Sequence, residues 1–341
     1  YTPGSSIAAT FTIDPTTCIR PVNRFDLYLV RPDGTEIPTP IGSYNGFYST
    51  FVNGIIPDAT IAPPATGYRL RIKTTDPILP IATSSLFEIR AGTPITAAIN
   101  SGSRVSTNPL TFGKCDTDPG QTSTPFIFEN TSSTGNVIVT IVNELDGGAP
   151  STMTFNSINE SKVFTAALAH YTMIVKATAN GTVATTSYFL VNNLAVTAFT
   201  TISGNTVCFP VGLFEYLVGT DRNGGIKDNF PGNTYSINWG DGSSNIYTYC
   251  DIVNLNKRVS HIYTQSSCGL TYNSGTQTTY NAFGINVGVV SPFCGQIGSP
   301  LSAAARVVER PQNSFTYPQI ACIGDGTFRN TSTSGRQPNS N

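Results

Sequence analysis

The sequence predicts an all-β protein assembled from several antiparallel β-sandwich modules. Apolar and polar residues alternate with a period of two from end to end, whereas the 3.6-residue period of an amphipathic helix is hardly visible. Charged residues make up only 11% of the chain and apolar residues 39%, and Thr, Ser, Asn and Gly, which favour strands and turns, are frequent. The length of 341 residues exceeds what one hydrophobic core supports and indicates about two to four modules.

The first module is predicted over residues 1–100. Within it Phe25, Leu27 and Leu29 alternate with polar neighbours, and residues 68–73 alternate apolar with basic side chains. This pattern predicts strands of an antiparallel sheet that has one buried face and one face in solvent.

The second module is predicted over residues 101–192, because the polar run 100–108 interrupts the alternation and marks a junction. Near its end a strand pattern over residues 171–175 leads into Asn180-Gly181. This pair adopts positive φ angles easily, so it predicts a two-residue hairpin turn.

The third module is predicted over residues 193–310, and the start of a further one over residues 311–341. Residues 283–289 form one of the clearest strand patterns in the chain. Cys208 and Cys322 each open the pattern Cys-x-x-x-Gly-x-Phe, which supports a modular repeat.

The charge balance excludes two classes of partner. Lys and Arg number 19 against 20 for Asp and Glu, so the net charge of −1 provides no field to attract nucleic acid or anionic lipid. No apolar run approaches the ~18 residues of a membrane-spanning helix. The chain begins at Tyr1 without a methionine and stops in a polar run, and we therefore expect an internal segment of a longer protein.

The stretch 236–243, Ser-Ile-Asn-Trp-Gly-Asp-Gly-Ser, holds the only tryptophan of the chain. Trp239 shares a strand face with Tyr235 and Ile237, so its side chain is predicted to point into the core. Two glycines supply unusual φ angles, and Asp241 between them can accept hydrogen bonds from turn amides. Asp241 is also a candidate ligand contact, but the interpretation as a structural turn is the stronger one.

Six residues of this region form a pattern: Trp239, Gly240, Asp241 and Gly242, followed after a long hairpin by His261 and Tyr263. The pattern resembles the PKD (polycystic kidney disease) domain, an immunoglobulin-like β-sandwich. The match is partial, because Ser236 or Ile237 stands where the longer motif has its first tryptophan. The resemblance implies tandem immunoglobulin-like (PKD-like) antiparallel β-sandwich domains and a structural role for these residues.

Two further segments extend the resemblance. Residues 321–335 resemble the opening of a PKD repeat from bacterial surface proteins, and residues 65–72 resemble sandwich repeats of the same kind of giant protein. Together the chain resembles part of a gliding-motility surface adhesin exported by a type IX secretion system. This implies an extracellular, cell-surface location, with extracellular surfaces or polysaccharides and the neighbouring modules of the same chain as partners.

Seven cysteines without a Cys-x-x-Cys pair favour disulfides over structural zinc, and disulfides suit an oxidising exterior. PKD repeats with cysteines near both ends imply two bridges in the third module: Cys208 with Cys294 and, across the inserted hairpin, Cys250 with Cys268. Cys18 and Cys115 are each alone in their modules, and they either cross-link neighbours or stay unpaired. The partner of Cys322 is expected outside this segment.

Catalytic and metal-binding patterns are sparse. His170 and His261 are the only histidines, so a multi-histidine metal site is nearly excluded and a catalytic base has two candidates. Nucleophile-elbow, phosphate-loop and zinc-protease motifs do not occur. The oxygen-rich turns 116–120 and 221–225 lack the later bidentate acid of a calcium loop, which favours ordinary loops. We therefore predict no enzyme activity, no cofactor and no metal.

Two other function classes remain open beside the adhesin. The segment could belong to the accessory region of a secreted polysaccharide- or protein-degrading enzyme whose catalytic domain lies elsewhere. It could also be a carbohydrate-binding module, which needs exposed aromatic rings, and Tyr44, Tyr48 and Tyr247 are the candidates.

Overall fold

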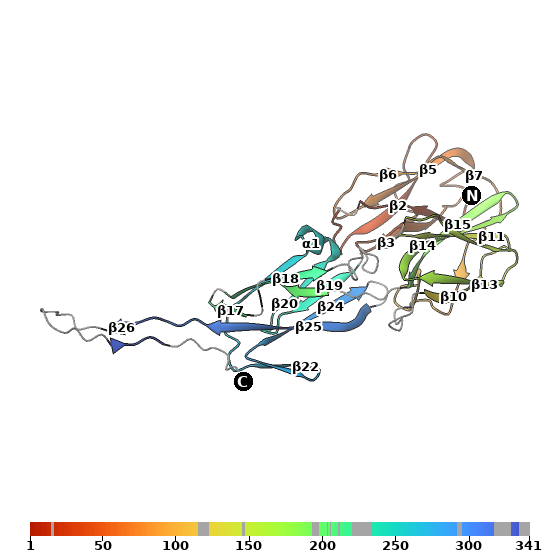
Figure 1. Cartoon of the computed structure of the whole chain (residues 1–341). Helices are drawn as coiled ribbons and strands as arrows, with labels where there is room; N and C mark the ends of the chain where they lie inside the picture. The colour runs from red at the N-terminus through yellow and green to blue at the C-terminus, as the bar shows by residue number, and fades with distance from the viewer. Residues whose placement is uncertain are drawn as a thin grey trace. The chain divides into compact units, whose positions relative to one another are not determined.

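The computed structural model describes residues 1–14, 17–114, 123–144, 147–192, 198–202, 204, 206–210, 212–219, 233–291, 295–316 and 329–333. These residues are almost entirely β structure, as predicted, and only one short α-helix lies among them (Figure 1). The chain divides into two compact units, one comprising mainly Tyr1–Val196 and the other Thr197–Thr220, Thr234–Val289 and Gly298–Asn341. Among the residues that the structure describes, no helix is long and apolar enough to cross a membrane.

The first sandwich encloses a core between a two-stranded and a larger antiparallel sheet. Phe25, Leu27 and Leu29 are buried in this core, which confirms the predicted inward face of their strand. The small sheet pairs β1 (Ser6–Thr10) with β4 (Phe51–Ile55), and the larger one has the order β3 (Gly42–Asn45), β2 (Arg24–Val30), β5 (Ala65–Thr74), β6 (Ala82–Thr83), with β7 (Phe87–Ile89) also on β5.

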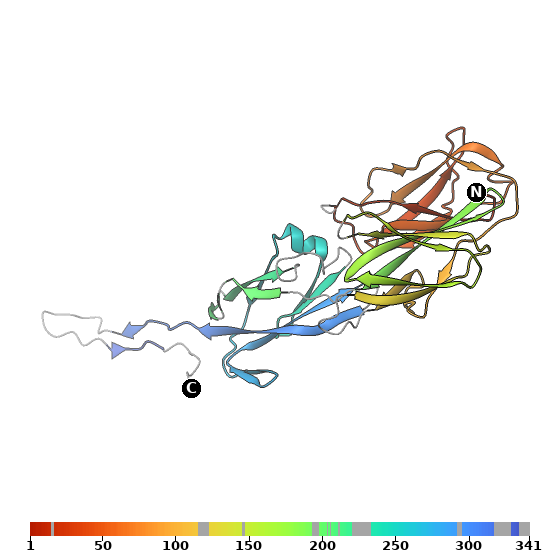
Figure 2. The same cartoon turned by 45° about the vertical axis from the view of Figure 1, so that its right-hand side comes forward.

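The second sandwich has a three-stranded and a five-stranded sheet. The first is ordered β13 (Ser161–Ala167), β10 (Ser123–Asn130), β8 (Ile99–Asn100), and the second β12 (Ser151–Phe155), β11 (Val137–Asn143), β14 (Ala169–Ala179), β15 (Thr182–Asn192), β9 (Thr111–Lys114). Figure 2 shows β14 and β15 as the long green hairpin. Asn180 and Gly181 join them with φ angles of 49° and 74°, which confirms the predicted two-residue turn.

The third sandwich, in the other unit, repeats this order. Its three-stranded sheet is β16 (Ala198–Thr201), β18 (Gly212–Gly219), β21 (Arg258–Tyr263), and its five-stranded sheet is β17 (Thr206–Phe209), β25 (Gly295–Glu309), β24 (Phe283–Ser291), β19 (Thr234–Asn238), β20 (Ser244–Thr248). Helix α1 (Tyr249–Asn254) and the hairpin of β22 (Thr271–Ser274) and β23 (Gln277–Tyr280) are additions to it, and β26 (Phe315–Thr316) pairs with β27 (Arg329–Asn330).

The second and third sandwiches therefore have an immunoglobulin-like topology. In each, the first strand is divided between the two sheets, and its second half runs parallel to the last strand: β9 beside β15, and β17 beside β25. In the letters used for this fold, strands B and E share one sheet with A, and strands C, F and G share the other. In the second sandwich A, B and E are β8, β10 and β13, and C, F and G are β11, β14 and β15. In the third they are β16, β18 and β21, and β19, β24 and β25. The hydroxyl of Tyr171, early in strand F, donates to the carbonyl of Ala167, the tyrosine corner of this fold.

The first two sandwiches are fused within one compact unit. At the junction the ring centres of Phe51 and Phe189 lie 4.5 Å apart, and Val191 belongs to the same buried cluster. The side-chain amide of Asn53 donates to the carbonyl of Ser187 and accepts from its amide. The two sandwiches thus share buried surface, and the residue at which one module passes into the next stays a prediction.

Candidate functional site

The motif residues meet on the third sandwich, where its two sheets face each other. Trp239 directly follows β19 of the five-stranded sheet, and the turn that follows returns the chain into β20. His261 and Tyr263 lie on β21 of the three-stranded sheet. Contacts between these residues therefore join one sheet to the other.

Trp239 is fully buried, as predicted. Its indole ring is stacked on the imidazole of His261 with ring centres 4.8 Å apart, and its N–H donates to Oδ1 of Asn245 at 2.6 Å. The hydroxyl of Tyr263 donates to the carbonyl of Trp239 at 2.9 Å. The tryptophan thus fills the core and satisfies its one polar group inside the protein.

Asp241 is the electrostatic centre of the turn. One carboxylate oxygen accepts hydrogen bonds from the amide and the hydroxyl of Ser243, at 3.0 and 2.6 Å, and the other accepts from Nε2 of His261 at 2.7 Å. Burial alone would raise the pKa of Asp241, but the hydrogen bonds from Ser243 and His261 outweigh it and hold the pKa below its ordinary value. Asp241 is therefore ionised and engaged by protein groups on both oxygens.

The trio of Ser243, His261 and Asp241 has the composition of a hydrolase triad but not its geometry. In a triad the serine and the acid contact opposite ring nitrogens, so that a proton can pass through the histidine. Here the carboxylate, at 2.7 Å, and the serine hydroxyl, at 3.4 Å, both face Nε2. The serine hydroxyl also donates to Asp241. The trio is therefore a structural clasp, and Ser243, which closes the motif stretch 236–243, has a role in it that the sequence did not indicate.

The two glycines of the motif are required for different physical reasons. Gly240 has a φ of +81°, and a Cβ there would lie 2.4 Å from the carbonyl oxygen of Gly284 on β24. Gly242 has a φ of +94° but open space around it. The first glycine is thus required by backbone conformation and by close approach of the neighbouring strand, and the second by conformation alone.

His170 is the other candidate base from the sequence, and it lies buried on β14 in the first unit. Burial lowers its pKa to about 3. A histidine with this pKa is neutral at physiological pH and a weak proton acceptor, which argues against general base catalysis.

The described cysteines correct the disulfide assignment. Cys18 and Cys250 are disulfide-bonded, whereas Cys208 and Cys268 retain their thiols, so both bridges expected in the third module are wrong. Cys208 lies opposite Val308 near the end of β25, whereas position 294 precedes that strand. Cys250 lies on α1, an element that the sequence pattern did not indicate.

Cys115, Cys294 and Cys322 lie outside the described residues. Cys18 is disulfide-bonded, and whether it pairs with Cys115, one of the alternatives left open by the sequence, stays untested.

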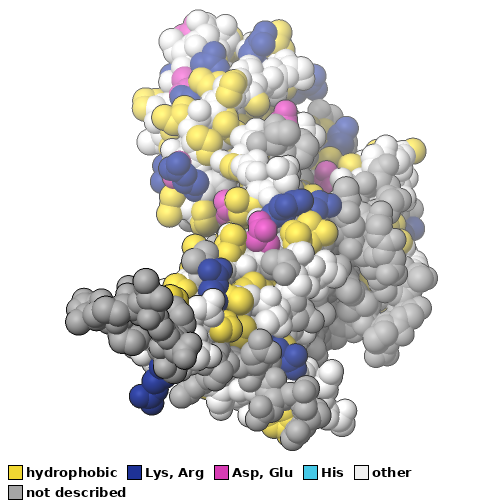
Figure 3. Space-filling model, turned by 60° about the vertical axis from the view of Figure 1, so that its left-hand side comes forward, with side chains coloured by type: hydrophobic (Ala, Val, Ile, Leu, Met, Phe, Trp, Pro, Cys, Tyr) yellow, Lys and Arg dark blue, Asp and Glu magenta, His cyan; other side chains and the backbone are white. Residues whose placement is uncertain are grey.

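The remaining candidates give no ligand site by themselves. The turns 116–120 and 221–225 lie outside the described residues, and among the residues that are described no cluster of His, Cys, Asp and Glu could hold a metal ion. Tyr44 packs between Phe25 and Phe189, and burial raises the pKa of Tyr48, so neither is an open aromatic platform. On the face drawn in Figure 3, Lys and Arg are interspersed with acidic and apolar side chains.

No family model and no curated protein matches the chain. Among solved structures it is similar to a segment of two fibronectin type-III domains from chicken tenascin, with 12% identity and a TM-score of 0.22 over 56% of this chain and 94% of that one. It is also similar to the FN1–FN3 domains of chicken CNTN1, with 9% identity and a TM-score of 0.22 over 89% and 95%. Extracellular domains 3–5 of Drosophila OTK match with 10% identity and a TM-score of 0.25 over 90% and 92%.

Proposed function

We propose that the chain is a segment of a bacterial cell-surface adhesin, a stalk of tandem β-sandwich repeats that serves surface attachment and gliding motility without catalysis. One observation carries the proposal. The second and third sandwiches have the same immunoglobulin-like strand order, and in the third the motif residues Trp239 and Asp241 both contact His261. Residues that close a fold in this way contribute to rigidity, which is what a stalk requires.

The features of the first unit fit a load-bearing segment. Its two sandwiches are held together by the buried ring pair of Phe51 and Phe189 and by polar contacts such as that between the hydroxyls of Thr50 and Thr172. A fused pair resists bending more than two domains on a flexible linker. The disulfides of Cys18 and Cys250 fit an oxidising, extracellular location, which export by a type IX secretion system would provide.

Attachment in this proposal comes from many weak contacts between exposed loops and extracellular surfaces or polysaccharides, summed along a long chain. The net charge of −1 is compatible with such contacts, because it produces no strong repulsion from either sign of surface.

A bead assay tests the proposal. Beads carrying the purified chain are allowed to settle on glass, polystyrene and polysaccharide films, and the retained fraction is counted under increasing flow. We expect retention above that of beads carrying serum albumin. Absence of retention on every surface would contradict attachment, and release of sugars or peptides from polymeric substrates by the purified chain would contradict a non-catalytic segment.

A further inference from the structure

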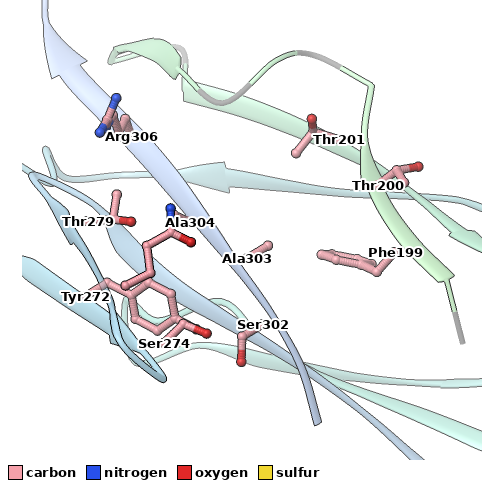
Figure 4. A pocket seen from close by; sticks show the side chains of 11 residues that line it. Phe199, Thr200, Thr201, Tyr272, Ser274, Thr279, Ser302, Ala303, Ala304 and Arg306 are labelled. Atoms are coloured by element: carbon pink, nitrogen blue, oxygen red, sulfur yellow. The ribbon is translucent and has the colours of Figure 1, made fainter. Parts of the chain in front are cut away.

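A cleft of about 540 Å³ lies on the third sandwich, within the second compact unit. Three elements line it: β16 of the three-stranded sheet, β25 of the five-stranded sheet, and the added hairpin of β22 and β23. Figure 4 shows Phe199 and Tyr272 on opposite sides of the cleft, with β25 running between them. Its volume is in the range of about 300–1,000 Å³ that is usual for small-ligand sites.

The cleft is open because β17 covers only a portion of β25. The described pairing of these strands begins where Thr206 lies opposite Arg306. The residues of β25 that line the cleft before this point, Ser302 to Ala304, therefore lie beyond the described pairing with β17. Within the part of the chain that the structure describes, the cleft thus occurs where β25 extends beyond its pairing with β17.

Arg306 is the charged group of the cleft, and its guanidinium makes no hydrogen bond or ion pair with the described residues. Its Nε atom is buried and has no partner. The lining contains no Asp or Glu that could neutralise the charge. Because this Nε is out of reach of a ligand, an anionic ligand would accept hydrogen bonds from the terminal N–H groups of Arg306, which no acceptor among the described residues occupies. The planar fork of arginine matches a carboxylate with two parallel hydrogen bonds.

Tyr272 supplies a fixed aromatic surface. A Cβ at Gly284 would lie 2.1 Å from its ring, which means that the ring rests directly on the backbone of β24. No aromatic ring among the described residues covers the other face. The electron-rich face of an aromatic ring attracts C–H groups that carry partial positive charge, such as those of a pyranose.

The rest of the lining is rich in hydroxyl and amide groups. Thr279 and Gln277 come from β23, and the hydroxyl of Ser302 on β25 donates to Asn286 at 2.9 Å and is therefore oriented. Such groups can both donate and accept, as the hydroxyls of a sugar do. An extended peptide would instead need apolar pockets for alternate side chains, and these polar walls do not provide them.

We propose that this cleft binds an acidic oligosaccharide, with the carboxylate of a uronic acid residue on Arg306 and a neighbouring sugar ring on Tyr272. The proposal deepens the proposed function, on which it rests, because it names a class of surface to which the segment attaches. The carboxylate gives specificity through the two hydrogen bonds from arginine, and the aromatic ring orients the chain of sugars along β25.

Calorimetric titration of the whole chain with oligogalacturonate and oligomannuronate tests the proposal. The methyl-esterified form of oligogalacturonate is the matched ligand control, because it keeps the sugar rings and removes the charge. We expect at least one acidic oligomer to bind, and we expect added salt to weaken its binding. The ester should bind more weakly than the acid by about tenfold or more.

Three variants locate the binding. Arg306→Gln is expected to weaken binding by about tenfold to a hundredfold, and Tyr272→Ala by about tenfold. Arg69→Gln changes an exposed arginine in the other unit and should leave affinity unchanged. Circular dichroism checks that each variant folds. If Arg306→Gln does not fold, the proposal is tested by weaker binding in Gln277→Ala and by the comparison of acid with ester.

Several results would overturn the proposal for this cleft. They are no binding of either acid at millimolar concentration, equal binding of acid and ester, a loss of affinity in Arg69→Gln equal to that in Arg306→Gln, or tighter binding of a sulfated oligosaccharide or an acidic peptide. The bead assay separates the two proposals. If beads are retained but the titration shows no binding, the cleft proposal is refuted and the proposed attachment is not. If the oligosaccharide binds but beads are not retained, the proposed attachment is refuted and the cleft proposal is not.

Discussion

Replacing Trp239 with alanine should destabilise the second unit and leave the first unchanged. The side chain is fully buried, its ring is stacked on His261 at 4.8 Å, and its N–H donates to Asn245. Removing a buried indole leaves a cavity and costs about 3–5 kcal/mol. For a unit of this size the loss corresponds to a melting temperature lower by roughly 10 °C or more.

Differential scanning calorimetry of the whole chain measures this loss. The first unit has its own buried clusters, around Phe25 and around Phe128, so its transition should stay in place while that of the second unit moves. Ile246→Ala is a matched control, because Ile246 is 74% exposed on the adjacent strand and its truncation should cost little. A loss below about 1 kcal/mol for Trp239→Ala, or an equal shift of both units, would refute the reasoning.

Three further predictions rest on other contacts. Gly240→Ala should destabilise the second unit by more than about 2 kcal/mol, and Gly242→Ala by only about 1 kcal/mol, because only the first adds a clash to an unfavourable φ; urea unfolding compares them, and equal costs would contradict the role of Gly284. Asp241→Asn should reduce stability most above about pH 5, because the lowered pKa of Asp241 gives stability that is present above the ordinary pKa and is lost as pH falls through the folded-state value; a difference that persists unchanged at about pH 2–3 in calorimetry would argue against it. Phe189→Ala should reduce the free energy of unfolding of the first unit by about 3 kcal/mol while its two sandwiches still unfold in a single transition; separate unfolding of one sandwich would show that they are independent.

Period-two alternation predicted the strands and their buried faces well. Tyr68, Leu70 and Ile72 are buried on β5, while Arg69 between them is exposed. The inward position of Trp239 was also predictable, because its face is shared with apolar neighbours on the same strand. Alternation works for these elements because one face of each strand meets the core and the other meets water.

Other features depend on contacts between distant regions of the chain and were not predictable. Phe51 and Phe189 are ordinary strand residues in sequence, and only the fold shows that they join two sandwiches. The pairing of seven cysteines cannot be deduced from their spacing, and a short helix carries Cys250 where a hairpin was expected. The clasp of Asp241 on His261 spans twenty residues and two sheets, so motif recognition could identify its members but not their geometry.

The parallel pairing of the first and last strands has a mechanical consequence for both immunoglobulin-like sandwiches. Because β9 runs in the same direction as β15, and β17 in the same direction as β25, the chain enters and leaves each strand pair at opposite ends. Tension along the chain then pulls the two strands lengthwise past each other. All the hydrogen bonds between them share the force and must break together, whereas an antiparallel hairpin pulled from its open end would lose its hydrogen bonds singly, in sequence.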